Sequence, residues 1–96
     1  MLFGNINKGL EEYRATPDAV LVDVREADEF GAGHIPGAVN EPLSAITGTA
    51  LPKDRTLFLY CLRGTRSKQA EKLLKYMGYR AKSIGGIAAY KGELEK

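Results

Sequence analysis

Cys61 is the only cysteine in this chain of 96 residues, and it follows the apolar run TLFLY, residues 56–60. A single cysteine cannot form a disulfide within the chain, and neither a CxxC pair nor a metal-ligand spacing surrounds it. The thiol is therefore inert, catalytic or redox-active. If it is inert, Cys61 is a small buried hydrophobic residue at the end of a strand. The following residues, CLRGTRS, favour chemistry because they bring two arginines to the thiol.

The segment after Cys61 has the composition of an anion-binding loop. Arg63 and Arg66 each offer a planar fork of N–H donors to an oxyanion. Cations at the start of a helix oppose its dipole, so an anionic ligand would explain both arginines. Gly64 allows a positive φ or a close backbone approach. If the loop turns its N–H groups inward and a helix begins near residues 65–67, those groups stabilise a thiolate on Cys61.

Three further side chains belong to this loop and keep open interpretations. Thr65 and Ser67 can each cap the helix or hydrogen-bond the thiolate or a sulfur bound to it. Leu62 can close the roof of a pocket or offer an apolar contact to a partner. We take Cys61 as the catalytic residue and residues 62–67 as the substrate-binding loop, with no metal site and no cofactor.

Size and charge exclude several classes of protein. The chain has the length of one domain with a single core, and we expect residues 1–96 to form it. Fourteen basic and 12 acidic residues give a net charge of +2, which is too balanced to indicate nucleic acid or a membrane as partner. No apolar run approaches the roughly 20 residues of a membrane span, and the N-terminus does not read as a signal peptide. The expected address is cytoplasmic.

Apolar patterning predicts strands that alternate with helices. We expect strands at residues 19–24, 56–60 and 79–84 and a short strand ending at Val39. We expect helical segments at residues 5–15, 26–30, 43–46 and 65–77, and a short one from residue 87. In the longest segment, the residues Ala70, Leu73, Leu74 and Met77 recur at helical spacing and predict one inward stripe, which Gly78 ends.

This order of elements predicts an α/β fold, with a central parallel sheet, helices on both faces and three layers in all. Residues 56–60 form a continuous apolar run, which is typical of a central strand covered on both faces. Ligands of open parallel sheets bind at the carboxyl ends of the strands. Cys61 therefore stands where chemistry is expected.

Two blocks of sequence resemble the rhodanese-like domains of the sulfurtransferase superfamily. The first is LVDVREADEFGAGHIPGAVNEPL, residues 21–43, and the second is LYCLRGTRSKQAEKLLKYMGY, followed by GGIAAY. The likeness covers about residues 18–91. It implies a single rhodanese-like domain around a five-stranded parallel sheet, in which Cys61 accepts a sulfane sulfur and carries it as a persulfide.

The upstream block holds four polar residues that we interpret as structural support. Asp23 ends a strand beside that of Cys61, so its carboxylate can accept loop N–H groups or pair with Arg25. Glu29 lies four residues after Arg25, the spacing of an ion pair on one helical turn. His34, the only histidine, could act as a base for the thiol, but a loop-activated thiolate needs none. In the family the matching histidine is likewise structural.

The chemistry expected of this loop is sulfur transfer from thiosulfate or another small anionic donor to a thiophilic acceptor such as cyanide, a thiol or a protein. A dedicated persulfide carrier, or a binding or sensor module with a protein partner, is the alternative from a different class. A Cys-loop phosphatase or arsenate reductase is disfavoured, because the Cys-x5-Arg pattern requires arginine at the position of Ser67, and Arg66 stands one residue too early.

Overall fold

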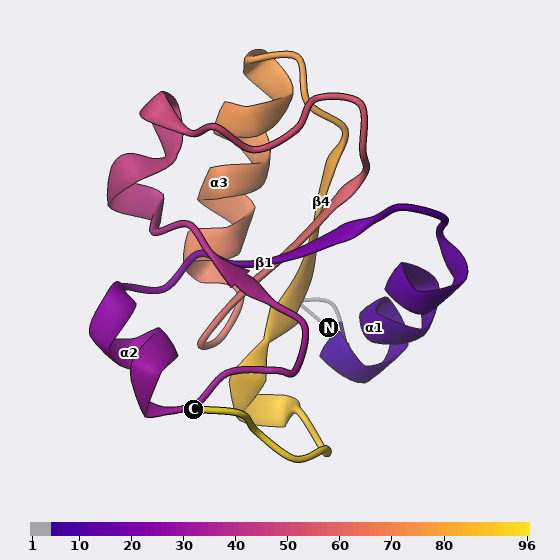
Figure 1. The fold of residues 1–96 in the computed structure, drawn as a ribbon, viewed down its shortest axis with the longest axis vertical. Coiled ribbons are helices and arrows are strands. Elements are labelled where there is room, and N and C mark those ends of the chain that lie inside the picture. Colours follow the sequence, from indigo (N-terminus) through magenta and orange to yellow (C-terminus); the bar gives the residue numbers. More distant parts are fainter. Residues whose placement is uncertain (1–4) are drawn as a thin grey trace.

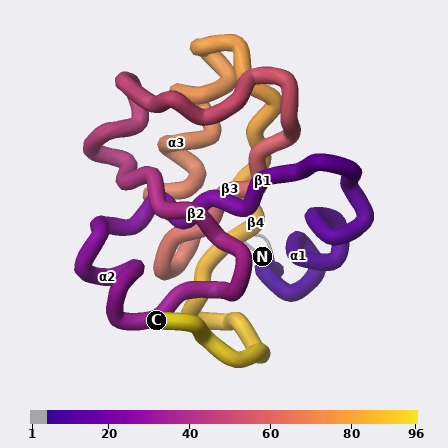
Figure 2. Tube along the Cα trace, in the orientation of Figure 1, coloured from indigo at the N-terminus to yellow at the C-terminus, as the bar shows by residue number. Residues whose placement is uncertain are grey.

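In the computed structural model, which describes residues 5–96, four parallel strands form one sheet in the order β2-β1-β3-β4 (Figures 1 and 2). Residues 1–4 lie outside this range. They are part of the expected domain 1–96 and of the N-terminus that does not resemble a signal peptide. The strands are β1 (Val20–Asp23), β2 (Val39–Asn40), β3 (Leu57–Cys61) and β4 (Ala81–Gly86). The parallel α/β architecture is confirmed, with four strands among the described residues where the family resemblance implied about five.

Helices cover both faces of the sheet, so the three expected layers are present (Figure 1). The helical elements are α1 (Ile6–Ala15), α2 (Ala27–Ala32), η1 (Leu43–Gly48), α3 (Thr65–Tyr76) and η2 (Ile87–Ala89). No helix within residues 5–96 is long and apolar enough to cross a membrane.

The alternation of side chains along β3 decides which face receives the thiol. Phe58 and Tyr60 are buried in a cluster with Ile6 and Leu10 of α1. Leu57, Leu59 and Cys61 are buried in the opposite cluster, which contains residues of α3 and η1. Because β3 lies between β1 and β4, it is the interior strand that its apolar sequence predicted. Cys61 thus ends an interior strand and points toward the layer of α3.

Helix α3 buries a narrower stripe than the sequence predicted. Ala70 and Leu74 are fully buried and Met77 is half-buried, but 39% of Leu73 is exposed. The prediction of an inward Leu73 is wrong because the buried stripe also includes Ser67, and residue 73 lies about 100° around the helix from Leu74. Leu73 therefore faces outward beside η1.

Strand β4 also starts and ends two residues later than predicted. The N–H of Tyr79 donates to Leu74 O (2.9 Å), so this residue still closes the end of α3 and is not yet part of the sheet. At its other end the strand runs on through the glycine pair, and Gly86 pairs with Cys61. The two glycines consequently lie beside the end of β3, where the thiol is.

Candidate active site

The sulfur of Cys61 lies beneath the loop that joins β3 to α3, and only 1% of the residue is exposed. Two backbone N–H groups donate to Sγ, from Gly64 (3.0 Å) and Ser67 (3.4 Å). Hydrogen bonds from N–H groups are stronger to a charged acceptor, so both stabilise negative charge on the sulfur. The loop therefore presents these N–H groups inward, toward the sulfur.

Gly64 makes this geometry accessible to the chain. It has the positive φ that its place in the loop suggested, 103°, and it is the N-cap of α3. The helix consequently begins at Thr65, directly after the turn, and its positive end faces the sulfur. A side chain at this φ would be strained.

Ser67 lies against the sulfur and does not cap the helix through its side chain. The thiol of Cys61 is 3.7 Å from Ser67 Oγ, and the Ser67 hydroxyl donates to Gly64 O (3.1 Å). Ser67 Oγ also lies 2.7 Å from the hydroxyl oxygen of Ser83 on β4. Of the two interpretations of Ser67, the contact with the thiol is the one that the geometry supports. Thr65 is exposed and caps nothing through its hydroxyl.

Arg66 pairs with Glu29, whereas the spacing in the sequence predicted that Arg25 would be the partner of Glu29. Its Nη1 and Nη2 donate to Oε1 and Oε2 of Glu29 (2.7 and 3.0 Å). These bonds, more than any other cause, lower the pKa of Glu29 to about 2 and raise that of Arg66. The expected ion pair between Arg25 and Glu29 is wrong, because Arg25 precedes the N-cap of α2, Glu26, and helical spacing does not apply to it.

The buried carboxylate of Asp23 pairs with Arg25 instead. Arg25 Nη2 lies 2.7 Å from Asp23 Oδ2, and the same nitrogen donates to Gly33 O (2.7 Å). The backbone N–H of Arg25 also donates to Asp23 Oδ1 (2.9 Å). Of the two interpretations given for Asp23, pairing with Arg25 holds. Arg25 therefore links the end of β1, the strand beside β3, to the end of α2 by binding both Asp23 and Gly33.

His34 lies among residues of α2 and of the C-terminal segment. Its ring stacks on Phe30 (3.7 Å between centroids), and its Nδ1 is 2.9 Å from Phe30 O. Its Nε2 is 3.7 Å from the carboxylate of Glu95, whose backbone pairs with that of His34. Within residues 5–96 no hydrogen bond or ion pair joins His34 to Cys61. These contacts agree with a structural interpretation of this histidine.

A small pocket of about 170 Å³ opens above the sulfur. Its lining residues are Cys61, Leu62, Arg63, Thr65 and Arg66. Arg63 is exposed, and 39% of Leu62 is exposed, so Leu62 stands at the mouth of the pocket. The pocket thus joins a nearly buried sulfur to a cationic entrance.

The pair Gly85 and Gly86 belongs to the segment that resembles the family, but the sequence did not predict its contact with the loop. A Cβ on Gly86 would lie 2.1 Å from Leu62 O and 2.5 Å from the Cα of Arg63. The N–H of Ala88 donates to the same carbonyl of Leu62 (3.1 Å). The backbone of the loop therefore packs directly against the backbone of Gly86 at the end of β4, with no room for a side chain between them. Ser83 was also missed, because a serine in a strand gives no signal of a partner 16 residues away.

Residues 7–93 match the sequence model of the family described as the rhodanese-like domain. The chain belongs to the rhodanese-like domain family. It is 37% identical over 71 residues to the thiosulfate sulfurtransferase PspE of Escherichia coli, covering 69% of this chain and 68% of that protein. It is 36% identical over 88 residues to a tRNA sulfurtransferase of Desulfurococcus amylolyticus, a match that covers 90% of this chain.

The lengths of these relatives differ greatly. The chain spans only 18% of the length of the tRNA sulfurtransferase of Desulfurococcus amylolyticus. By contrast, the crystal structure of SSP1007 from Staphylococcus saprophyticus matches over 100% of both chains, with a TM-score of 0.83 and 27% identity. The comparisons therefore identify the family and the fold of this chain, while its substrates and partners have to be argued from the site.

Proposed function

We propose that this protein is a sulfurtransferase that accepts the outer sulfur of thiosulfate and carries it as a persulfide on Cys61. The observation that carries the proposal is the pair of N–H groups, from Gly64 and Ser67, that donate to a thiol at the end of an interior strand. Similarity to a thiosulfate sulfurtransferase supports this choice of donor. The acceptor is cyanide, a low-molecular-weight thiol or the thiol of a protein.

The reaction has two displacement steps. In the first, the Cys61 thiolate attacks the outer sulfur of thiosulfate, a new S–S bond forms, the old S–S bond breaks, and sulfite leaves with the electron pair. In the second, a nucleophilic acceptor attacks the outer sulfur of the persulfide, and the Cys61 thiolate leaves. No oxidant or reductant is consumed. The N–H groups at Sγ stabilise the leaving thiolate in the second step.

The two loop arginines have different parts in this proposal. Arg63 is exposed at the pocket and orients the oxyanion of the donor. Arg66 donates two of the five N–H groups of its guanidinium to Glu29, which leaves three for another acceptor. Arg66 therefore also faces the donor, in an orientation that Glu29 fixes.

The test is incubation with thiosulfate, followed by the intact mass of the protein and then by thiocyanate formation on addition of cyanide. We expect the mass of one added sulfur atom, lost again with cyanide, and neither signal in Cys61→Ser. Arg63→Gln, whose site is exposed, should still fold but require more thiosulfate for the same rate. Sulfur uptake by Cys61→Ser would refute the assignment of Cys61.

A dedicated persulfide carrier that serves one protein partner is the second candidate, and the charge distribution favours it. Residues 61–76 contain five basic side chains and one acidic side chain, a net charge of +4, whereas the whole chain has +2. A cationic surface next to the thiol suits an acidic protein as donor or acceptor. If thiosulfate and cyanide give no turnover while a persulfidated partner does, the protein is this carrier.

A further inference from the structure

An apolar groove lies at the surface between α3 and the start of η1. It has a volume of about 400 Å³ and is lined by Leu43, Gln69, Lys72 and Leu73. Leu73 is 39% exposed here although its helical spacing predicted an inward side chain. Ala70 and Leu74 supply the buried side chains of this part of α3, and Leu73 is not among the residues of the core cluster.

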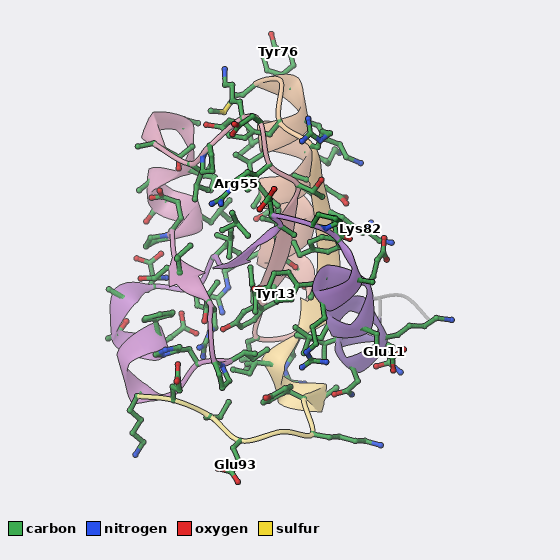
Figure 3. The ribbon with its side chains drawn as sticks, turned by 45° about the vertical axis from the view of Figure 1, so that its right-hand side comes forward. Glu11, Tyr13, Arg55, Tyr76, Lys82 and Glu93 are labelled. Carbon is green, nitrogen blue, oxygen red and sulfur yellow. The ribbon has the colours of Figure 1, made fainter. Side chains whose placement is uncertain are left out.

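The groove and the Cys61 pocket lie along one face of α3. Thr65 lines the pocket, and Gln69, Leu73 and Tyr76 follow it at intervals of three or four residues, the spacing of one helix face. With a rise of ~1.5 Å per residue, Leu73 lies roughly 12 Å along the helix from Thr65. Tyr76, 92% exposed, projects at the far end of α3 (Figure 3). An exposed stripe therefore leads from the thiol pocket to an apolar groove.

The charges beside this stripe are mostly uncompensated. Among residues 5–96, neither Lys72 nor Arg63 forms an ion pair. Lys68 and Lys75 share the single carboxylate of Glu71, at 3.5 and 3.8 Å. The groove thus combines aliphatic walls with excess positive charge, and a partner that complements it is acidic and carries an apolar side chain.

We propose that this face of α3 docks an acidic protein segment that exchanges sulfur with Cys61 and places an apolar side chain in the Leu43–Leu73 groove. The proposal rests on the sulfurtransferase function proposed above. An extended segment rises about 3.3 Å per residue, so roughly four residues separate its apolar side chain from its thiol. In the transfer, the thiolate of the segment attacks the outer sulfur of the Cys61 persulfide, and the Cys61 thiolate leaves.

The aliphatic walls favour a protein segment over RNA. Proteins that bind single-stranded nucleic acid stack the bases on aromatic side chains. The groove is lined by two leucines, a glutamine and a lysine, which offer an aliphatic side chain a cavity and a base no stacking platform. The exposed ring of Tyr76 lies outside this lining, at the far end of α3.

The test uses three synthetic acceptor peptides, each with one cysteine and one leucine. The first has glutamates around them and leucine four residues from cysteine, the second has lysines in place of the glutamates, and the third is acidic with leucine next to cysteine. Cys61 persulfide, formed with thiosulfate and desalted, is mixed with each peptide, and sulfur transfer is followed by mass. We expect the first peptide to react about tenfold faster than the second at low salt, because two or three weak ion pairs together supply that factor.

Variants of the protein separate docking from chemistry. Lys72→Glu should lower the preference for the acidic peptide, whereas Lys8→Glu, the same charge change on exposed α1 across the sheet, should leave it unaltered. Leu73→Gln should remove the preference for the spaced leucine. Each rate is divided by the rate of the same sample with cyanide, which reports the chemical step alone.

The outcomes distinguish the two proposals. If no sulfur reaches cyanide or any peptide, the sulfurtransferase function has failed. If cyanide accepts sulfur but all three peptides react equally, or Lys8→Glu acts like Lys72→Glu, the docking surface is refuted. Inhibition by a single-stranded RNA oligonucleotide, with no discrimination among the peptides, would overturn it in favour of nucleic acid.

Discussion

Replacing Gly86 by alanine tests whether the end of β4 holds the active-site loop in place. The added Cβ would lie 2.1 Å from Leu62 O, 2.5 Å from the Cα of Arg63 and 2.6 Å from the carbonyl carbon of Leu62. All three are backbone atoms, so no side chain can rotate away. Either the loop or the strand has to move by roughly 1.0–1.4 Å to restore ordinary contact distances near 3.5 Å.

Such a movement has two measurable costs. Overpacking of this kind destabilises a protein by about 1–3 kcal/mol. A displacement of about 1 Å at reacting groups can slow a reaction by roughly 100-fold. Because the movement changes the loop that donates to the sulfur, we expect sulfur uptake from thiosulfate to fall by a factor of at least about 10, more than the lost stability explains.

The assay is the rate of persulfide formation by mass, together with urea unfolding of the same samples. Gly31→Ala is the matched control, because a Cβ at this position of α2 meets nothing within 4 Å. Alanine in a helix is favoured over glycine by roughly 0.5–1 kcal/mol, so this control should be at least as stable as the parent and equally active. Parent-like sulfur uptake and stability in Gly86→Ala would refute the reasoning.

Three further predictions concern polar contacts of the loop. Glu29→Gln should lower the free energy of unfolding by about 1 kcal/mol at pH 7, since the pair with Arg66 is about one-third exposed and water screens it. The pKa of Glu29 is about 2 in the folded protein, against 4.5 for the free carboxyl group, so this contribution is complete above pH 4.5 and is lost toward pH 2. The free energies of unfolding of parent and variant, measured with urea, should therefore become equal near pH 2. A difference that stays constant with pH contradicts the assignment. Ser83→Ala should slow persulfide formation roughly fivefold, the value of one hydrogen bond that orients Ser67; Ser83→Thr should restore the rate, and equal rates for both would reject the role.

The local parts of the site could be predicted from the sequence. The end of β3, the turn at Gly64 and the start of α3 are adjacent in the chain, and their conformations follow from an apolar run, a glycine and a helical period. The direction of the Cys61 side chain also follows from alternation along a single strand. Each of these features depends on residues a few positions apart.

The parts that were missed depend on contacts between distant segments. Glu29 meets Arg66 across 37 positions, and Ser67 meets Ser83 across 16. A glutamate or a serine can bind many kinds of polar partner, and only the packing of the helices and strands determines which partner lies within reach. The fit of Gly86 under the loop is likewise a matter of tertiary distance. The prediction that Leu73 is buried was wrong for a different reason. Helical spacing gives the relative directions of side chains, but it does not give the width of the helix face that is covered.

In the proposed reaction, the groups that stabilise the sulfur differ from the group that binds the donor, and this leads to a test by salt. The donors at Sγ are backbone N–H groups buried beneath the loop, while the guanidinium of Arg63 is exposed. Salt screens exposed charges with a Debye length near 10 Å at 0.1 M and screens buried contacts far less. Raising the salt concentration should therefore increase the thiosulfate concentration required for half-maximal sulfur uptake, while the rate of transfer from a preformed persulfide to a thiol acceptor without other charged groups stays nearly constant. If that second step slowed as strongly as the first, exposed charge and not the backbone N–H groups would govern the reactivity of the sulfur.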